Sequence, residues 1–215
     1  MDQAETHFAR AHALMARSEG GDALAEAAEE MRKAADLGHP AAANNYGAML
    51  HHGRGVEVDL PLARACYAIA AEAGLAAGQF NLGFMWLHGL GGSQDTTEAR
   101  ALFVAAAAGD DGDALTHLGR MAMVGEGGPQ DFAAAREWWE KGAALGDGRC
   151  AYNLGVANAG GHGAPPDFVA AYSWFQKALA LGNASAVAEL EKLGSVMSPE
   201  EQDKARAAAG AARES

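Results

Sequence analysis

Glycine recurs at a fixed interval along this chain, and this period constrains the fold more than any other feature. Gly47, Gly83, Gly119 and Gly155 follow one another at 36 residues, each inside an apolar stretch with helical spacing. A second series closes alanine-rich stretches at Gly38, Gly74, Gly109, Gly146 and Gly182, with intervals of 36, 35, 37 and 36 residues. The residue lost before Gly109 is restored in the next interval, so the phase is kept. Such a period is typical of arrays in which one structural unit stacks on the next.

Each period contains two segments of about a dozen residues whose apolar positions have helical spacing, joined by a glycine-rich connector. The connectors end at Asp59, Asp95, Asp131 and Asp167, and we expect each carboxylate to cap the helix that follows. Glu98, three residues after Asp95, completes the pattern of a reciprocal capping box. Glycine at the start of each connector suits the left-handed residue that ends a helix. These features predict an all-α chain built from helix–turn–helix units.

The glycines in the middle of helices need a compensating reason. Each costs about 1 kcal/mol relative to alanine, so four cost about 4 kcal/mol, which is a large share of the net stability of a domain. Close approach of the two helices in a unit supplies a reason, because a methyl group would push them apart. We therefore expect Gly47, Gly83, Gly119 and Gly155 to mark the places where paired helices touch.

The second unit shows the full pattern of one repeat. It contains Asn81-Leu82-Gly83-Phe84-Met85-Trp86, Gly89-Leu90-Gly91, Asp95, Ala99, Leu102-Phe103 and Ala106-Ala107. This pattern resembles the Sel1-like repeat, a relative of the tetratricopeptide repeat. Leu50, Ala122 and Asn158 depart from it, because the family usually has tyrosine or tryptophan there. The resemblance implies a right-handed α/α superhelix, or solenoid, with a C-terminal capping helix.

The period and the resemblance divide the chain into three parts. Four Sel1-like repeats are predicted at residues 40–75, 76–110, 111–147 and 148–182, within the range 40–182. Residues 1–39 are expected to form a degenerate N-terminal repeat or cap. Residues 183–215 are expected to form C-terminal capping helices and a frayed tail, with Ser198 and Glu201 marking one capped helix. Charged side chains crowd both ends, as the polar outer faces of terminal units require.

The first helix of every pair lines the inner surface of such a superhelix. By similarity to tetratricopeptide geometry, the groove-facing positions lie three before the mid-helix glycine and one, four and five after it. They are Phe8, His12, Asn44, His51, His52, Phe80, Phe84, Leu87, His88, Thr116, Arg120, Met123, Tyr152 and Val156, and Met15 follows the same rule. This mixture of aromatic, thioether and hydrogen-bonding side chains is typical of a protein interface. The alternative is that Phe80, Phe84 and Tyr152 pack between neighbouring helices.

The histidines are also candidate metal ligands, because imidazole suits zinc, copper and nickel. His52 and His88 occupy the same position in adjacent units, and His51 and His162 are further candidates. No acidic or cysteine ligand shares their register, so hydrogen-bonding contacts at the groove edge are the favoured interpretation. We expect no metal and no other cofactor.

The two cysteines are expected to be free, buried thiols. Cys66 and Cys150 lie in the first and fourth full units, and the units between them imply a separation of about 20 Å or more at about 8–10 Å per stacked helix. A disulfide needs Cα atoms within about 7 Å of each other. The pairs Trp138-Trp139 and Trp174-Phe175 lie on second helices and are expected in the core.

The sequence does not favour an enzyme. It has no Gly-x-Ser-x-Gly elbow, no Gly-x-x-x-x-Gly-Lys loop, no His-Glu-x-x-His helix and no Cys-x-x-Cys pair. The glycine-rich connectors occur once per unit at a helix end, so geometry explains them better than phosphate binding does. A hydrolase or metal-dependent enzyme is kept as the least favoured alternative.

Charge and composition restrict the possible partners. The 28 acidic and 16 basic residues give a net charge of −12, which repels phosphate backbones and anionic lipid surfaces. The sequence has no apolar run of about 18 residues and its first residues do not resemble a signal peptide. We therefore expect a cytoplasmic protein that binds neither nucleic acid nor the membrane interior.

The resemblance implies a non-catalytic adaptor or scaffold, as in many bacterial signalling and assembly factors. Such a protein would hold a peptide or a helix of a partner protein along its concave groove, with Phe80, Phe84 and Arg120 as the preferred anchors. The main alternative is an inhibitor or immunity-type protein that caps a toxin or an enzyme. The acidic charge would then complement a basic target.

Overall fold

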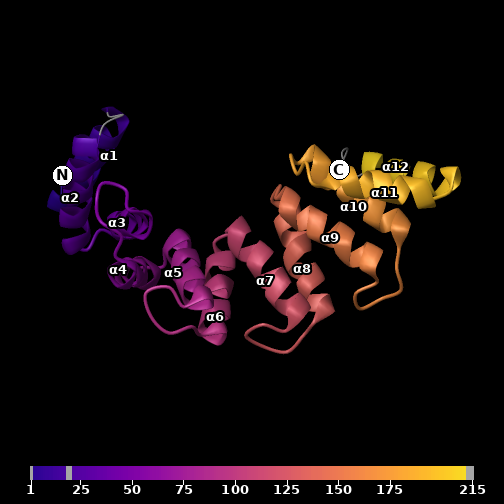
Figure 1. The fold of residues 1–215 in the computed structure, drawn as a ribbon, viewed down its shortest axis with the longest axis horizontal. Coiled ribbons are helices and arrows are strands. Elements are labelled where there is room, and N and C mark those ends of the chain that lie inside the picture. The colour runs from indigo at the N-terminus through magenta and orange to yellow at the C-terminus, as the bar shows by residue number, and fades with distance from the viewer. Residues whose placement is uncertain (1, 18–20, 212–215) are drawn as a thin grey trace. The chain divides into compact units, whose positions relative to one another are not determined.

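The chain is almost entirely helical. The structure, a computed structural model, describes residues 2–17 and 21–211, and within these residues it has twelve α-helices and no strand (Figure 1). The helices belong to two compact units, Met1–Asp111 and Gly112–Ser215. The predicted all-α class is confirmed. The frayed tail predicted for the last residues falls partly on residues 212–215, which lie outside the described residues.

The first unit holds six helices that pack as pairs. They are α1 (Gln3–Arg17), α2 (Gly21–Asp36), α3 (Pro40–His52), α4 (Leu60–Glu72), α5 (Ala76–His88) and α6 (Thr96–Ala108). Each odd-numbered helix packs against the helix that follows it, and neighbouring pairs meet where α2 packs on α3 and α4 packs on α5. The first helices α3 and α5 also touch each other directly. Helix pairs stacked in sequence order are therefore present, as the period predicts.

The second unit has the same construction and then ends in two further helices. It contains α7 (Gly112–Val124), α8 (Phe132–Ala144), α9 (Gly148–Gly160), α10 (Phe168–Ala180), α11 (Ala186–Val196) and α12 (Pro199–Ala211). The pairs α7/α8 and α9/α10 stack through α8 and α9, and α7 touches α9. Both α11 and α12 pack on α10, so they cover the helix that would otherwise face a following repeat.

The predicted aspartate caps begin the second helix of each full pair. The carboxylates of Asp59, Asp131 and Asp167 each accept a hydrogen bond from the backbone N–H three residues later, at 3.0, 2.9 and 2.8 Å. Asp95 accepts from two N–H groups, those of Thr97 and Glu98, at 3.0 Å each. The reciprocal box predicted for Asp95 is not formed, because its own N–H donates to the carbonyl oxygen of Trp86 at 3.0 Å.

A complete reciprocal box is found at the start of α12 instead. The Ser198 N–H donates to the Glu201 carboxylate at 2.8 Å, and the Glu201 N–H donates to the Ser198 hydroxyl at 3.3 Å. This confirms the capped helix that Ser198 and Glu201 predict, and it satisfies two backbone donors that the first turn leaves without a helical partner.

The mid-helix glycines lie where paired helices touch, as predicted, and each faces an aromatic ring. The rings belong to Tyr67, Phe103, Trp139 and Phe175 of the second helices, which face Gly47, Gly83, Gly119 and Gly155 respectively. A methyl group at Gly83 would stand 2.9 Å from Phe103 and 3.2 Å from the carbonyl oxygen of Ala99. The four rings are themselves spaced by 36 residues. In each of the four pairs from α3/α4 to α9/α10, one aromatic ring of the second helix therefore packs against one glycine of the first helix.

The connector glycines have the predicted left-handed backbone. Gly53, Gly89 and Gly161 end their helices with φ of 68°, 65° and 67°. The 35-residue interval before Gly109 does not reflect a shorter structural repeat. Gly109 has φ of −94°, and the next residue, Asp110, adopts the left-handed conformation instead, with φ of 59°. Position 110 lies 36 residues after Gly74 and 36 before Gly146, which have φ of 80° and 90°. The structural period is therefore constant through this region.

Only one residue of each predicted aromatic pair lies in the core. Trp139 and Phe175 are 4% and 1% exposed, whereas Trp138 and Trp174 are half-buried. Both cysteines are buried and free, as predicted. None of the helices in the described part of the chain combines the length and the apolar character needed to cross a membrane.

Candidate functional site

Five of the predicted groove residues in α3 and α5 form a continuous row of ring side chains. The imidazoles of His51 and His52 stack with centroids 4.5 Å apart and planes 5° apart. Across the two helices, His51 lies 6.5 Å from the Phe84 ring, centroid to centroid. Phe84 in turn lies 4.3 Å from His88 and 6.5 Å from Phe80. We call these five residues the ring row.

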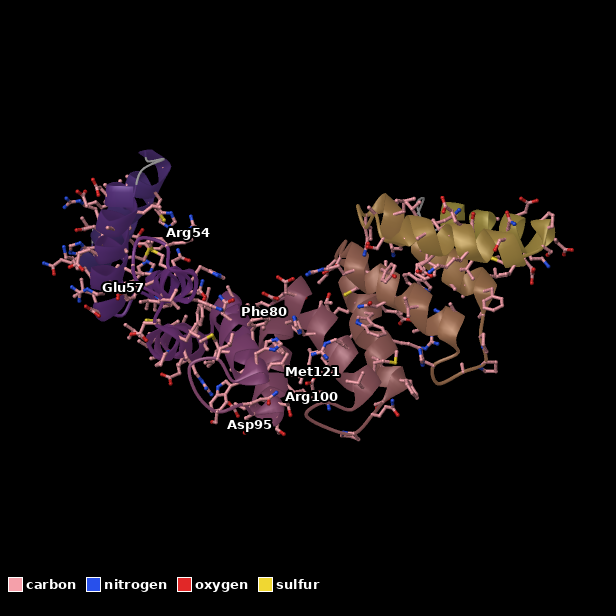
Figure 2. All side chains as sticks on the ribbon, in the orientation of Figure 1. Arg54, Glu57, Phe80, Asp95, Arg100 and Met121 are labelled. Atoms are coloured by element: carbon pink, nitrogen blue, oxygen red, sulfur yellow. The ribbon has the colours of Figure 1, made fainter. Side chains whose placement is uncertain are left out.

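The ring row is supported on the core at two points and reaches solvent at its ends. Phe80 contacts the buried ring of Phe103 at 5.6 Å, and His51 contacts the buried ring of Tyr67 at 6.5 Å. Phe80, Phe84 and His51 are half-buried, whereas His52 and His88 are exposed. Figure 2 labels Phe80 on α5. The row therefore combines fixed aromatic surface with accessible imidazoles.

The pKa of His51 is lowered by burial and, to a lesser extent, by the neighbouring His52. The neutral imidazole is therefore favoured at position 51 near neutral pH. A neutral imidazole has one nitrogen that donates and one that accepts a hydrogen bond. The row can thus offer polar groups as well as aromatic contact area without a fixed positive charge at its centre.

The predicted residues of α1 form a separate group. The Phe8 ring meets His12 edge-on at 4.5 Å and stacks on His39 at 4.3 Å. His39 was not predicted, although it directly precedes Pro40, the first residue of α3. Its Nδ1 accepts from the Ala42 N–H at 3.2 Å, and its Nε2 lies 3.2 Å from the Glu5 carboxylate. His39 therefore caps α3 and fixes Phe8 at the same time.

An amide pair links the two first helices beside the ring row. The Asn81 side-chain amide donates to the side-chain oxygen of Asn44 at 2.9 Å. Asn44 was predicted in the groove and Asn81 was not, although both carry side chains suited to such a bond. Leu87 lies elsewhere, because it is 2% exposed and belongs to the core. It presents no side-chain surface to a partner in this structure.

The predicted residues of the second unit are placed on α7 and α9. The Thr116 hydroxyl lies 3.3 Å from the Asp147 carboxylate and 3.2 Å from the Cys150 sulfur. Arg120 is exposed and pairs with Glu126 of the connector at 2.8 Å. Tyr152 contacts the core ring of Phe175 at 5.4 Å.

The remaining two predicted residues of this unit differ in exposure. Met123 is half-buried, and its backbone carbonyl accepts a hydrogen bond from the Gln130 side chain at 2.8 Å. Val156 is 40% exposed. Among the predicted residues of this unit, Arg120 and Val156 therefore present the most open side chains.

The buried thiols do not supply a nucleophile. Burial raises the pKa of Cys66 and of Cys150 to about 11, and the hydrogen bond with Thr116 only partly opposes this at Cys150. Both sulfurs are therefore protonated at neutral pH, whereas the thiolate is the reactive form. Among the described residues, no three histidine, cysteine, aspartate or glutamate side chains are grouped to hold a metal ion. The groups brought together here are suited to binding contacts.

Comparison with known proteins agrees with this architecture. The Sel1 repeat family model matches residues 40–75, 76–111, 112–147 and 148–183. These matches leave the whole of α1, α2, α11 and α12 outside the four repeats. No curated protein matches the chain in sequence.

Several solved structures share the fold. The protective antigen c5321 of uropathogenic Escherichia coli, which displays an SLR fold, has 27% sequence identity and a TM-score of 0.83, with 88% of this chain covered. This chain spans 41% of the length of that protein. A Sel1 repeat protein from Oxalobacter formigenes has 27% identity and a TM-score of 0.76, covering 88% of this chain and 72% of its own. The immunity protein Pa5087 from Pseudomonas aeruginosa has 22% identity and a TM-score of 0.55, covering 86% and 69%, and this likeness concerns the fold alone.

Proposed function

The chain belongs to the Sel1 repeat family, and we propose that it is a non-catalytic scaffold that holds a peptide or a helix of a partner protein on the face of α3 and α5. Sel1 repeat proteins generally mediate protein–protein interactions, and the fold is typically a non-catalytic interaction scaffold. The ring row is the observation that carries the proposal. It lies on first helices, where stacked pairs present their common binding surface.

The physical properties of the ring row suit a protein partner. Aromatic side chains supply large contact area and have few rotatable bonds to immobilise. The contacts of His51 with His52 and of Phe84 with His88 hold these rings before a partner arrives. Less side-chain freedom is then lost on binding, which favours affinity.

Phe84 is the best candidate for a central anchor. Its neighbours in the ring row are His51, His88 and Phe80. Phe80 also lies against the core ring of Phe103, so removing Phe80 would disturb packing as well as any interface. Truncation at a buried interface anchor typically costs about 2 kcal/mol or more of binding free energy.

The proposal can be tested by capture from the native cell with variant chains as bait. Phe84→Ala should lose the captured partner while the melting temperature falls by only a few degrees. Val104→Ala is a suitable control, because Val104 is 43% exposed and lies on a second helix. Equal capture by both variants, with both folded, would exclude the ring row as the binding surface.

The second unit offers an independent arm of this test. Arg120→Ala removes an exposed cation whose partner is the connector residue Glu126. Since exposed ion pairs contribute about 0–1 kcal/mol, folding should be kept. Loss of the partner in this variant would show that Arg120 of the second unit also contributes to binding, and retention would show that it does not.

A role as an inhibitor or immunity-type protein is a second proposal, and it is supported by the net charge of −12. Such a charge would draw in a basic toxin or enzyme at a rate that falls as salt screens the attraction. Stopped-flow measurement of the rate at which the chain associates with its captured partner, at rising ionic strength, tests this directly. A rate independent of salt would favour an apolar peptide partner over a basic enzyme.

A further inference from the structure

A small cavity in the first unit combines an apolar floor with a polar rim that carries one arginine. Its volume is about 130 Å³ and it lies between α1, α2 and α3. Met15, Leu24 and Met49 form the apolar part, with Ala48 beside them. Asn45, His52 and Arg54 form the polar part. Figure 2 labels Arg54 close to α3.

The sequence of α3 and its connector explains how these groups meet. Asn45, Ala48, Met49 and His52 follow the spacing i, i+3, i+4 and i+7, so they lie on one face of the helix. Arg54 stands between two left-handed glycines, Gly53 and Gly55, with φ of 68° and 74°. The Arg54 N–H donates to the Met49 carbonyl at 2.9 Å, and Gly55 lies directly against the backbone of Leu24. The connector is thus held against the cavity.

The next helix pair shows why the space is open here. Position 84 corresponds to position 48 after 36 residues, and there the Phe84 ring packs between His51 and His88. Ala48 has only a methyl group to offer at this place. Position 90 corresponds to position 54, and it is Leu90 instead of an arginine. The small residue and the cation therefore occur together in the first full repeat.

We propose that this cavity binds the C-terminal residue of a partner peptide. The terminal carboxylate lies against Arg54 and His52, and an aliphatic side chain of the same residue fills the space over Met15, Leu24 and Met49. This inference rests on the proposed function, because it names the part of the partner that is recognised.

The charges around the cavity favour an anion. The chain as a whole carries −12, yet among the described residues the side chains that line this cavity include the cation Arg54 beside His52 and no carboxylate. An arginine beside apolar surface binds a carboxylate through paired hydrogen bonds. A free amino acid would also bring an ammonium group, for which the described lining residues supply no carboxylate. An acylated terminal residue, as in a peptide, therefore suits the cavity better.

The size and layout of the cavity favour a chain end over an acidic side chain. A volume of 130 Å³ holds roughly four groups of the size of a water molecule at about 30 Å³ each, which matches a leucine or isoleucine side chain. In a terminal residue, the carboxylate and the aliphatic group leave the same carbon atom. Aspartate and glutamate carry no apolar branch beside their carboxylate.

The experiment uses the full chain and two libraries of short acetylated peptides. Both libraries have randomised upstream positions and a C-terminal leucine, once as the free acid and once as the amide. We expect the acid library to bind at least about tenfold more tightly, as for the loss of a hydrogen bond to a charged group. Equal binding of both libraries, or no binding of either, would overturn the proposal. A third, control library ends in an amidated aspartate, whose only carboxylate at the chain end is in the side chain. Tighter binding of this control than of the leucine acid would assign the cavity to acidic side chains and would also contradict the proposal.

Three protein variants locate the site. Arg54→Gln should weaken binding of the acid library about tenfold and leave binding of the amide library unchanged. Ala48→Phe should prevent binding of both libraries, because its ring would occupy the place that Phe84 occupies in the next pair. Arg100→Gln is matched to Arg54→Gln in charge and lies on α6, so it should bind like the wild type. Circular dichroism confirms that each variant is folded, and exposed Arg54 can be replaced without disturbing the core. Equal loss in Arg54→Gln and Arg100→Gln would indicate general attraction to charge and would refute the site.

Failure of this inference is distinguishable from failure of the proposed function. If Phe84→Ala abolishes capture of the native partner while the acid library shows no preference, the scaffold role stands and the C-terminal site is refuted. If the acid library binds through Arg54 while Phe84→Ala captures the partner normally, the C-terminal site stands and the ring row is refuted as the main interface.

Discussion

The phenyl ring of Phe103 lies against the backbone of Gly83, and a methyl group added at position 83 would stand 2.9 Å from its Cε1 atom. The ring is fully buried, at 0% exposed, so any shift of the ring must be accommodated by neighbouring core residues. The same relation recurs at the three other mid-helix glycines, each with its own ring. The pairing of the two helices in every repeat therefore depends on a glycine that helix propensity alone disfavours.

Gly83→Ala should destabilise the protein, although alanine is the better helix former. Overpacking a filled core costs about 1–3 kcal/mol, which exceeds the gain of about 1 kcal/mol in helix propensity. Chemical denaturation of the full chain measures the change in its free energy of unfolding. The cost should shrink in a Phe103→Leu background, because leucine lacks the ring atom that meets the new methyl group. Equal costs in the two backgrounds would show that the ring is not the cause.

Gly146→Ala tests the backbone requirement separately from packing. Gly146 has φ of 90°, and no atom lies within 4 Å of the place that a methyl group would occupy, so only the left-handed conformation opposes a side chain. The expected loss of unfolding free energy is about 1–2 kcal/mol. Gly194→Ala is the matched control, since its surroundings are equally open and its φ is not positive. This control should be stabilised by up to about 1 kcal/mol.

The Glu30 carboxylate should make the stability of the fold depend on pH in the acid range. Its pKa is lowered, mainly by the hydrogen bond with His7 at 2.7 Å and then by Lys33, against the opposing effect of burial. Because the folded-state pKa lies below the unfolded value, the stabilisation is complete above that unfolded value, about 4.3, and is lost as the pH falls towards the folded pKa. Melting temperatures recorded from about pH 6 downwards should therefore fall less steeply in Glu30→Gln than in the wild type. Parallel curves would contradict this.

The two thiols should be slow to react in the folded protein. Cys66 and Cys150 are buried, and burial raises the pKa of each to about 11. Less than about one per cent of either is thiolate near neutral pH, and the thiolate is the reactive form. A chromogenic disulfide reagent should therefore label both only as fast as the chain opens, and both should react at once in denaturant. Fast labelling of either thiol under native conditions would contradict its placement in the core.

The sequence predicts the repeat well because its determinants are local. Helical spacing, the aspartate caps and the connector glycines each act within a few residues, and they are found where predicted. The partner of each mid-helix glycine was expected only as a neighbouring helix. Its identity as a ring 20 residues later, such as Tyr67 for Gly47, depends on the exact side-by-side packing of the pair. Asp110 likewise shows that a left-handed position can be filled by a residue other than glycine.

The proposed binding surface was harder to predict because it depends on contacts between neighbouring repeats. The positional rule found the ring row, but it also selected Leu87, which is buried. It missed Asn81, whose bond to Asn44 joins two helices 37 residues apart in sequence. From the sequence alone, Arg54 could be assigned only to a glycine-rich connector. Its place at the cavity follows from the contact of Gly55 with Leu24 in the preceding helix pair.

Oxidative footprinting of side chains in the partner-bound protein tests the central claim most directly. If the face of α3 and α5 holds the partner, Phe84, His52 and His88 lose reactivity when the captured partner is added, because they become shielded from solvent. Phe168, which is 43% exposed on the second helix α10, keeps its reactivity. Unchanged reactivity of the ring row, with protection found only on second helices such as α4 and α6, would contradict the account.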